Sequence, residues 1–331
     1  MKNIKQQPFC KCSKKNEKFT NPYLKDLKRS FKDVILWKTG YWKKTNPCKH
    51  PPKDFVYPKD EKNLIESDSK ARWLGHSSFL IQYKDVAVLT DPIWSKRCSP
   101  VQFAGPKRKI HPPIEIDKLP EIHYVMISHN HYDHLDKYTV LKLHKRFPNI
   151  CWIVSKEVKK WFTKLGIKNV QELNWWEDYT ENNQGMTVRF TAVPTQHFSG
   201  RSLLDLNKTL WCGFMMEIDE KKIYFAGDTG YNPYQFKEIG QHFKKIDLSL
   251  IPIGAYIPRE FMKTVHIGPQ EAVKVHQDVN SSFSIGMHWN TFRLSDEPRS
   301  LPPYDLYLSM KKADLDPKKF IAINIGEQVY F

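Results

Sequence analysis

Long apolar runs are missing from this sequence of 331 residues. No stretch approaches the roughly 20 consecutive apolar residues that a bilayer-spanning helix needs. The first residues, MKNIKQQPFCKCSKKNEKF, also lack the apolar core of a secretory signal. These absences argue against a membrane-spanning or secreted protein. They predict a cytoplasmic protein that either stays in solution or attaches peripherally to a membrane.

Cysteine is also sparse, with six residues scattered along the chain. A chain of this length buries enough apolar surface to fold without covalent crosslinks, so we expect reduced thiols and no disulfide framework. Two alternatives stay open near the N-terminus. Cys10, Cys12, Cys48 and His50 could form a small zinc cluster, although their spacing departs from the usual C-x(2–4)-C. Cys10 or Cys12 could instead be acylated.

Positive charge is abundant and unevenly placed. The net charge is +16, and residues 1–70 hold 18 Lys and Arg against 8 Asp and Glu. Within this segment, VILWKTGYWKK (34–44) mixes aromatic rings with lysines, as at a membrane interface. We interpret residues 1–70 either as a solvated basic extension partly packed on the body or as an arm for an anionic lipid surface. Nucleic acid is a remote alternative, since the charge lies away from the predicted catalytic region and no RNA-binding signature occurs.

The rest of the chain, residues 71–331, predicts one α/β domain. Short apolar runs separated by turns are typical of strands, and several are apolar on both faces, as in sheets buried between layers. Apolar residues at helical spacing interrupt them, which favours helices outside the sheets. The predicted strands are 79–83, 86–92, 124–128, 151–155, 188–193, 211–218, 222–228, 248–254 and 283–289. The predicted helices are 138–147, 155–166 and 268–279.

A dense group of metal-ligand side chains follows the predicted strand 124–128. The stretch SHNHYDHLD (128–136) contains His129, His131, Asp133 and His134. One short loop cannot aim all four at a single ion without strain, whereas two neighbouring ions can share them. Imidazole and carboxylate ligands suit Zn²⁺, with Fe and Mn as alternatives.

Three later strand ends supply further ligands. FTAVPTQHFSG ends near His197, IYFAGDTG near Asp228 and SIGMHWNTF near His288. Asp228 has two carboxylate oxygens and is therefore predicted to bridge both ions. The predicted ligands of the first ion are His129, His131, His197 and Asp228, and those of the second are Asp133, His134, His288 and Asp228.

These motifs resemble a known superfamily. SHNHYDHLD, QHF, FAGDTGY and MHWNTF are similar to the five-motif pattern of the metallo-β-lactamase fold. Longer stretches, among them WLGHSSFLI, LTDPIWSKRCSPVQFAGPKR and IPIGAYIPREFMKTVHIGPQEAVKVHQDV, resemble the N-acylphosphatidylethanolamine-hydrolysing phospholipase D family. The likeness runs from about Trp73 to the C-terminus. It departs from the family at Phe198, where Trp is familiar, and at Asn290, where Gly is familiar.

The resemblance implies an αββα sandwich, with two mixed β-sheets flanked by helices, and a zinc phospholipase D activity. Its products would be an N-acylethanolamine and phosphatidic acid. We expect a hydroxide bridging two Zn²⁺ ions to attack the phosphorus of the phosphodiester, with Asp133 orienting it. Alternatives are a soluble phosphodiesterase or lactonase of the same fold and, remotely, a nuclease. Whether the protein is a monomer or a homodimer stays open.

Several further residues are candidates for substrate contact. His266, in KTVHIGPQEA, is predicted to touch the phosphate or to polarise the leaving oxygen. Arg201 follows His197 by four residues and is predicted to hold an anionic headgroup. Tyr132, between the ligands, is expected to line the site. His76, in GHSS, is assigned a structural role.

Overall fold

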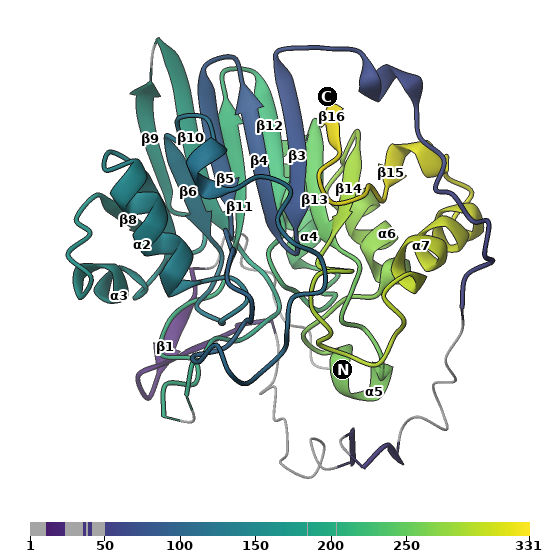
Figure 1. Ribbon diagram of the computed structural model, residues 1–331, viewed down its shortest axis with the longest axis horizontal. Helices are drawn as coiled ribbons and strands as arrows, with labels where there is room; N and C mark the ends of the chain where they lie inside the picture. The colour runs from purple at the N-terminus through teal and green to yellow at the C-terminus, as the bar shows by residue number, and fades with distance from the viewer. Residues whose placement is uncertain (1–10, 24–35, 38, 42–49, 184, 203) are drawn as a thin grey trace.

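Two mixed β-sheets lie at the centre of the molecule, with helices on both outer sides (Figure 1). The computed structural model describes residues 11–23, 36–37, 39–41, 50–183, 185–202 and 204–331. Each large sheet has seven strands. The predicted αββα sandwich is therefore confirmed.

The first sheet has the order β16-β3-β4-β5-β6-β7-β8. It is antiparallel from β16 to β5 and parallel from β5 to β8. Parallel neighbours need crossover connections, and helices α2 (Lys137–Arg146) and α3 (Lys159–Thr163) lie in two of them. The strands are β3 (Ser69–Gly75), β4 (Ser78–Tyr83), β5 (Val86–Thr90), β6 (Tyr124–Ile127), β7 (Cys151–Ser155), β8 (Val170–Leu173) and β16 (Gln328–Tyr330).

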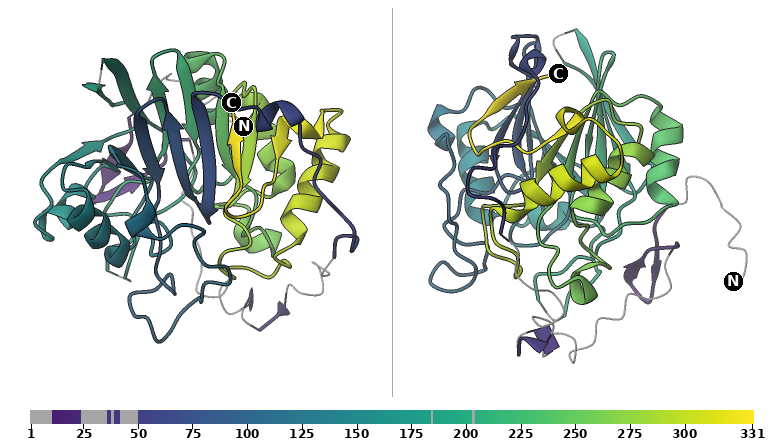
Figure 2. Two further views of the ribbon diagram at one scale, coloured as in Figure 1. Left: turned by 45° about the horizontal axis from the view of Figure 1, so that its top comes forward. Right: turned by 90° about the vertical axis from the view of Figure 1, so that its right-hand side faces the viewer.

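The second sheet has the order β15-β14-β13-β12-β11-β10-β9. It is antiparallel from β9 to β12 and parallel from β12 to β15. The strands are β9 (Asp178–Asn183), β10 (Met186–Val193), β11 (Gly213–Ile218), β12 (Lys221–Phe225), β13 (Leu248–Pro252), β14 (Ser284–Met287) and β15 (Phe320–Ile321). The helices in its connections are α4 (Gln235–Phe243), α5 (Arg259–Met262), α6 (Pro269–Asp278) and α7 (Leu301–Lys312), of which α6 and α7 lie together outside the sheet (Figure 2).

Strand alternation explains why the first sheet is apolar on both faces. In β6, Tyr124 and Met126 join the core between the two sheets, whereas Val125 and Ile127 join the core under α2 and α3. Successive side chains of a strand point to opposite faces, so a strand between two layers needs an unbroken apolar run. All nine predicted strands exist. Of the predicted helix 155–166, only α3 is α-helical.

The described part of the basic segment packs against the body. Strands β1 (Ser13–Lys15) and β2 (Lys18–Thr20) form a hairpin, and the side chains of Cys12 and Phe19 are buried in the same hydrophobic cluster as Tyr124 and Met126. Lys14 Nζ lies 2.6 Å from Glu157 Oε1. Residues Cys10, Trp42 and Cys48 fall outside the described ranges, so the zinc-cluster and acylation hypotheses stay predictions, as does the division of the chain at residue 70. Over the described ranges, no helix has the length and apolar character to cross a membrane.

Candidate metal centre

The first group of predicted ligands converges directly after β6 and β10. His129 Nε2 lies 2.8 Å from His131 Nδ1, and His197 Nε2 lies 3.3 Å from the same atom. The rings of His129 and His197 are buried, with 1% of each residue exposed. Three ring nitrogens therefore face one point, and they come from both sheets.

The second group lies beside it. Asp133 Oδ2 is 3.4 Å from His134 Nε2 and 3.6 Å from His288 Nε2. Asp228 Oδ2 is 3.1 Å from each of those two ring nitrogens. The same Asp228 oxygen lies 3.8 Å from His197 Nε2. Asp228 therefore stands between the two groups, the position that a bridging carboxylate requires.

Strand ends deliver these side chains to one edge of the sandwich. Asp228 follows β12 through Gly227, whose φ is +59° and whose absent Cβ would lie 2.9 Å from the Cys212 carbonyl oxygen. That Cβ would also lie 2.9 Å from Ser128 Cβ, at the end of β6, so a side chain at Gly227 would clash with both neighbours and glycine is required there. His288 follows β14 with a φ of +63°, a conformation that is uncommon outside glycine. The backbone at both positions is shaped to turn a ligand inward.

Hydrogen bonds behind the rings fix which nitrogen faces the centre. His134 Nδ1 donates to Asp91 Oδ2 at 2.6 Å, and His197 Nδ1 donates to the Val265 carbonyl at 2.9 Å. Each ring then presents Nε2 to the other predicted ligands. Metal-binding histidines are commonly oriented in this way.

The buried polar atoms of this cluster fit a divalent cation. Within the described part of the chain, His134 Nε2, His288 Nε2 and Asp228 Oδ1 are buried without a hydrogen-bond partner. Leaving such an atom unsatisfied costs about 1–3 kcal/mol, and a cation would give these atoms a partner. Four overlapping sets of three or four residues have ligand atoms within 4.8 Å of one another. The donor set of imidazoles and carboxylates suits Zn²⁺ or a similar ion.

Burial and charge act in opposite directions on the ionisation of the cluster. Burial lowers the pKa of His129 and His197 well below the ordinary value, which keeps the rings neutral and able to bind a cation. Burial would raise the pKa of Asp228, but His134 and His288 outweigh it and hold the carboxyl pKa well below its usual range. For His288, burial is outweighed by Asp228 and Asp133, which raise its pKa to about 9. The ring therefore holds a proton near neutral pH, and a bound cation would replace that proton.

Of the three predicted substrate residues, His266 lies at the cluster, whereas Arg201 and Tyr132 contact each other at the ligand loop. His266 Nδ1 lies 3.9 Å from Asp228 Oδ2, and 15% of the His266 side chain is exposed, which places it at the rim. Arg201 Nη1 donates to the Asn130 and Leu135 carbonyls at 2.8 Å each. Its guanidinium carbon lies 3.9 Å from the ring centre of Tyr132. Arg201 therefore braces the ligand loop from outside.

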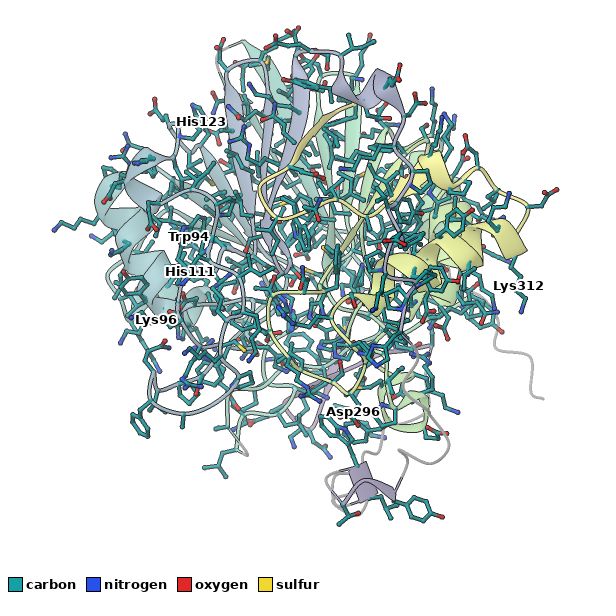
Figure 3. The ribbon with its side chains drawn as sticks, turned by 45° about the vertical axis from the view of Figure 1, so that its right-hand side comes forward. Trp94, Lys96, His111, His123, Asp296 and Lys312 are labelled. Carbon is teal, nitrogen blue, oxygen red and sulfur yellow. The ribbon has the colours of Figure 1, made fainter. Side chains whose placement is uncertain are left out.

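Tyr132 and Arg201 also line a pocket of about 780 Å³. Its wall includes Trp94, Lys96 and His111, which lie on one side of the molecule beside α2 (Figure 3). The pocket is therefore partly aromatic and partly cationic, and it lies on the outer side of the ligand loop.

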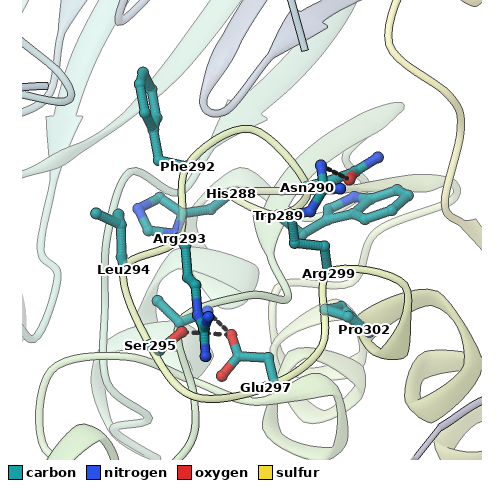
Figure 4. A pocket seen from close by; sticks show the side chains of 11 residues that line it. His288, Trp289, Asn290, Phe292, Arg293, Leu294, Ser295, Glu297, Arg299 and Pro302 are labelled. Atoms are coloured by element: carbon teal, nitrogen blue, oxygen red, sulfur yellow. Dashed lines mark hydrogen bonds between the residues drawn. The ribbon is translucent and has the colours of Figure 1, made fainter. Parts of the chain in front are cut away.

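A second hollow, of about 20 Å³, adjoins His288. Figure 4 shows Arg293 and Arg299 around it, with Ser295 donating to Glu297 at 2.7 Å. Asn290, which stands where the resembled family pattern has glycine, has a φ of +58°. Asparagine tolerates this left-handed conformation better than most residues, so the loop keeps its shape without glycine.

Two residues beside the cluster were missed by sequence reasoning. Asp91 hydrogen-bonds to His134 as described above, and His76, to which we assigned a structural role, has its Nε2 atom 2.9 Å from Asp133 Oδ2. Asp91 directly follows β5, the same strand-end signal that pointed to Asp228. His76 lies in the turn between β3 and β4 and carries no such signal.

Comparisons with known proteins agree with this fold. Residues 87–289 match the Beta-lactamase superfamily domain. A relative from Caenorhabditis elegans, N-acyl-phosphatidylethanolamine-hydrolyzing phospholipase D 1, is 40% identical over 79% of this chain and 76% of its own. The mitochondrial N-acyl-phosphatidylethanolamine-hydrolyzing phospholipase D of Saccharomyces cerevisiae is 40% identical over 68% of this chain, which spans 48% of that protein. The metallo hydrolase Igni18 of Ignicoccus hospitalis shares the fold, with a TM-score of 0.60 and 21% identity over 80% of this chain and 98% of its own.

Proposed function

We propose a zinc-dependent lipid phosphodiesterase activity for this chain, which belongs to the family of N-acyl-phosphatidylethanolamine-hydrolysing phospholipases D within the β-lactamase superfamily. The reaction would release an N-acylethanolamine and phosphatidic acid. The observation that carries the proposal is the position of Asp228, whose Oδ2 atom lies within 3.8 Å of His197 Nε2 and 3.1 Å of His134 Nε2. One carboxylate therefore reaches both groups of imidazoles.

Seven residues would hold two divalent cations, taken to be zinc. The cations would supply Lewis acidity toward a water molecule and toward the phosphate oxygens. The first would be held by His129, His131 and His197, the second by Asp133, His134 and His288, and both by Asp228.

The residues around the cations would guide the chemistry. The water oxygen would form a bond to phosphorus and release one proton to solvent, and the bond from phosphorus to the ethanolamine oxygen would break. Asp133 would orient the attacking water. His266, at the rim, would bring a proton to the departing oxygen, because its ring lies 5.1 Å from that of His197 and 5.4 Å from that of His288. Acid assistance of this kind contributes about 10²–10⁴-fold to rate.

The pocket beside the ligand loop suits an amphipathic substrate. Trp94, Trp161 and Leu141 give it an apolar wall, and Arg201 and Lys137 give it positive charge. Pockets with apolar walls and a few placed polar groups are typical of small-molecule sites. We assign it to one acyl chain of the lipid, with Tyr132 at the end nearest the cations.

We propose a cytoplasmic protein that attaches peripherally to a membrane, because its proposed substrate is a membrane phospholipid. Phe103 and Leu204 are 85% and 83% exposed, and the basic segment before residue 70 carries aromatics and lysines at 34–44. Changing Lys43 and Lys44 to Gln should weaken binding to anionic vesicles more at low salt than at high salt. If the variant binds the vesicles as well as wild type at low salt, a membrane-binding role of residues 1–70 is contradicted.

Two substrates distinguish the proposal from its main alternative. The zinc-loaded protein would be incubated with vesicles containing N-acylphosphatidylethanolamine and, separately, with bis-p-nitrophenyl phosphate. Release of N-acylethanolamine supports the proposal. Cleavage of the soluble ester with no lipid turnover would favour a soluble phosphodiesterase instead.

The variant Asp228→Asn tests the cation-binding residues in the same assay. It keeps the shape of the side chain but removes the charge that both groups of imidazoles face. We expect turnover to be lost and bound zinc to fall. An active variant with full metal content would rule out the bridging role.

A further inference from the structure

We propose that His76 is a positioning residue, which fixes both the carboxylate of Asp133 and the backbone of His288 at the second cation position. The inference rests on the proposed two-cation site and goes beyond it. His76 lies in the turn between β3 and β4 of the first sheet, whereas His288 follows β14 of the second. A single residue therefore connects ligands that reach the site from different sheets.

The side chain of His76 acts on Asp133. His76 Nε2 lies 2.9 Å from Asp133 Oδ2, and the residue is only 1% exposed. Because an ionised carboxylate can only accept hydrogen bonds, Nε2 must carry the proton and donate it. The donated bond restrains the carboxylate, while Asp133 Oδ2 also lies 3.6 Å from His288 Nε2. Asp133 is thereby held at the second cation position.

The backbone of His76 acts on His288. The His288 N–H donates to the His76 carbonyl at 3.0 Å, and the His76 N–H donates to Thr291 Oγ1 at 2.6 Å. His76 and His288 have φ angles of +56° and +63°. Left-handed backbone costs about 1–2 kcal/mol per residue outside glycine, so these hydrogen bonds hold both residues in a shape that the chain would otherwise leave.

Packing leaves the His76 ring little freedom to turn away. Its centroid lies 4.1 Å from that of His288 and 5.2 Å from that of Phe292, which meets it edge to face. Phe292 is backed in turn by the guanidinium of Arg108, 4.9 Å from its ring centre. The Nε2 donor therefore stays aimed at Asp133.

His76 also belongs to a set of four residues whose ligand atoms lie within 4.8 Å of one another, with Asp133, His134 and His288. Direct ligation through Nε2 is the competing assignment. The 2.9 Å from His76 Nε2 to Asp133 Oδ2 is shorter than the 3.4 and 3.6 Å from that oxygen to His134 Nε2 and His288 Nε2, and it matches a hydrogen bond. We therefore assign His76 to the orientation of Asp133, and the variants described next distinguish this role from direct ligation.

Two variants that differ by one methylene test the side-chain role. In His76→Gln, the longer amide can place its N–H where Nε2 lies now. In His76→Asn, the amide is too short to reach Asp133, and asparagine tolerates the left-handed backbone, so the variant adds little strain. Zinc stoichiometry and affinity would be measured by competition with a chromophoric chelator, and cobalt absorption would report the geometry of each cation position.

We expect His76→Asn to lower the affinity for one of the two cations by about 10–100-fold, the usual effect of losing a hydrogen-bond partner of a ligand. The affinity for the other cation should stay unchanged. His76→Gln should keep both near wild-type affinity. The control is His276→Asn, which alters a buried histidine that hydrogen-bonds to Ser284 in β14 and should retain both cations.

Three results would overturn the inference. Wild-type affinities for both cations in His76→Asn would remove the positioning role. An equal loss in Asn and Gln variants would make His76 a direct ligand. Equal weakening of both cations in His76→Asn, with a lowered free energy of unfolding, would reduce His76 to general support of the fold. A wild-type protein that binds fewer than two cations would instead contradict the proposed function itself, and this inference with it.

Discussion

Asp91 Oδ2 lies 2.6 Å from Nδ1 of His134, and both side chains are fully buried. The Asp91 carboxylate also accepts hydrogen bonds from Ser128, through the backbone N–H at 2.7 Å and the hydroxyl at 2.5 Å. Both of its oxygens are therefore used by donors. Asp91 ties the end of β5 to the start of the ligand loop and directs His134 Nε2 toward Asp228.

The variant Asp91→Asn should lose both stability and metal. Its amide nitrogen must face a donor in either orientation, the Ser128 N–H or the His134 Nδ1–H. Breaking a buried charged pair costs about 3–5 kcal/mol, and losing the partner of a ligand weakens metal binding by about 10–100-fold. Urea unfolding of the metal-free protein and zinc titration would measure the two effects separately.

Asp278→Asn is the matched control for this change. Asp278 accepts a hydrogen bond from the Tyr231 hydroxyl at 2.7 Å, at the end of α6 and apart from the cluster. It should lose a little stability and no zinc affinity. Unchanged zinc binding in Asp91→Asn would contradict the orienting role of Asp91.

Arg201→Lys should loosen the ligand loop without removing charge. Arg201 makes two hydrogen bonds to backbone carbonyls and stacks on Tyr132, and a lysine ammonium cannot reproduce the planar fork. We expect a loss of about 1–2 kcal/mol in the free energy of unfolding and a lower kcat. A raised KM as well would indicate the predicted headgroup contact.

Arg189→Lys provides the comparison for Arg201. The Arg189 side chain is 52% exposed, and its nearest acidic atom, Asp178 Oδ2, is 3.8 Å from Nε. Its replacement should stay within about 0.5 kcal/mol of wild type. An equal effect of the two substitutions on unfolding would refute the bracing role of Arg201.

The N-terminal hairpin offers a test of how much of the basic segment belongs to the folded body. Phe19 is 3% exposed and belongs to the hydrophobic cluster that includes Tyr124 and Met126, and its N–H donates to the Asn207 carbonyl at 2.8 Å. Truncation of a buried phenylalanine costs about 3–5 kcal/mol, so Phe19→Ala should lower the urea midpoint strongly. Tyr41→Ala, at a residue 63% exposed, should not. Equal midpoints for the two variants would show that the hairpin is dispensable for folding.

The sandwich was predictable because most of its strands are buried on both faces and therefore read as unbroken apolar runs. Strand β9 gave no such signal, since its sequence DYTENN alternates between exposed and half-buried positions. It forms because β10 offers a free edge, an effect of tertiary context on strand formation. Helix α4 was not predicted either, and it too depends on tertiary context. It contains Gly240, which is required because a Cβ at this position would lie 2.1 Å from the Asp278 carbonyl oxygen. That close approach exists only after folding.

The convergence of the candidate ligands could be anticipated for a different reason, namely that each group of them follows the end of a strand. Strands β6, β10, β12 and β14 end where these side chains meet, so a local pattern was enough to anticipate that they lie together, and their role as metal ligands stays a prediction. His76 could not be found in this way. Its contacts with Asp133 and His288 depend on how the β3–β4 turn meets the second sheet, and no spacing in the sequence encodes that meeting.

His276 predicts a pH dependence of stability that is separate from the metal centre. Its ring is 7% exposed, bonds through Nδ1 to Ser284 Oγ at 2.8 Å and stacks on Phe320. Burial lowers the pKa of His276 to about 4, below the value of about 6.5 in an unfolded chain. Between these two pH values the unfolded state binds a proton that the folded state does not. The stability that His276 contributes is therefore complete above about pH 6.5 and is lost as the pH falls toward 4.

The difference corresponds to about 3 kcal/mol at 1.36 kcal/mol per pKa unit. Urea unfolding of the metal-free protein at about pH 7 and about pH 4 would be compared between wild type and His276→Asn, in which the short amide can still bond to Ser284. Other buried histidines titrate in both proteins, so their effect cancels in the comparison. Wild type should lose about 3 kcal/mol more than the variant on acidification. If wild type and the variant lose the same free energy of unfolding on acidification, the His276 ring is protonated as easily in the folded protein as in the unfolded chain.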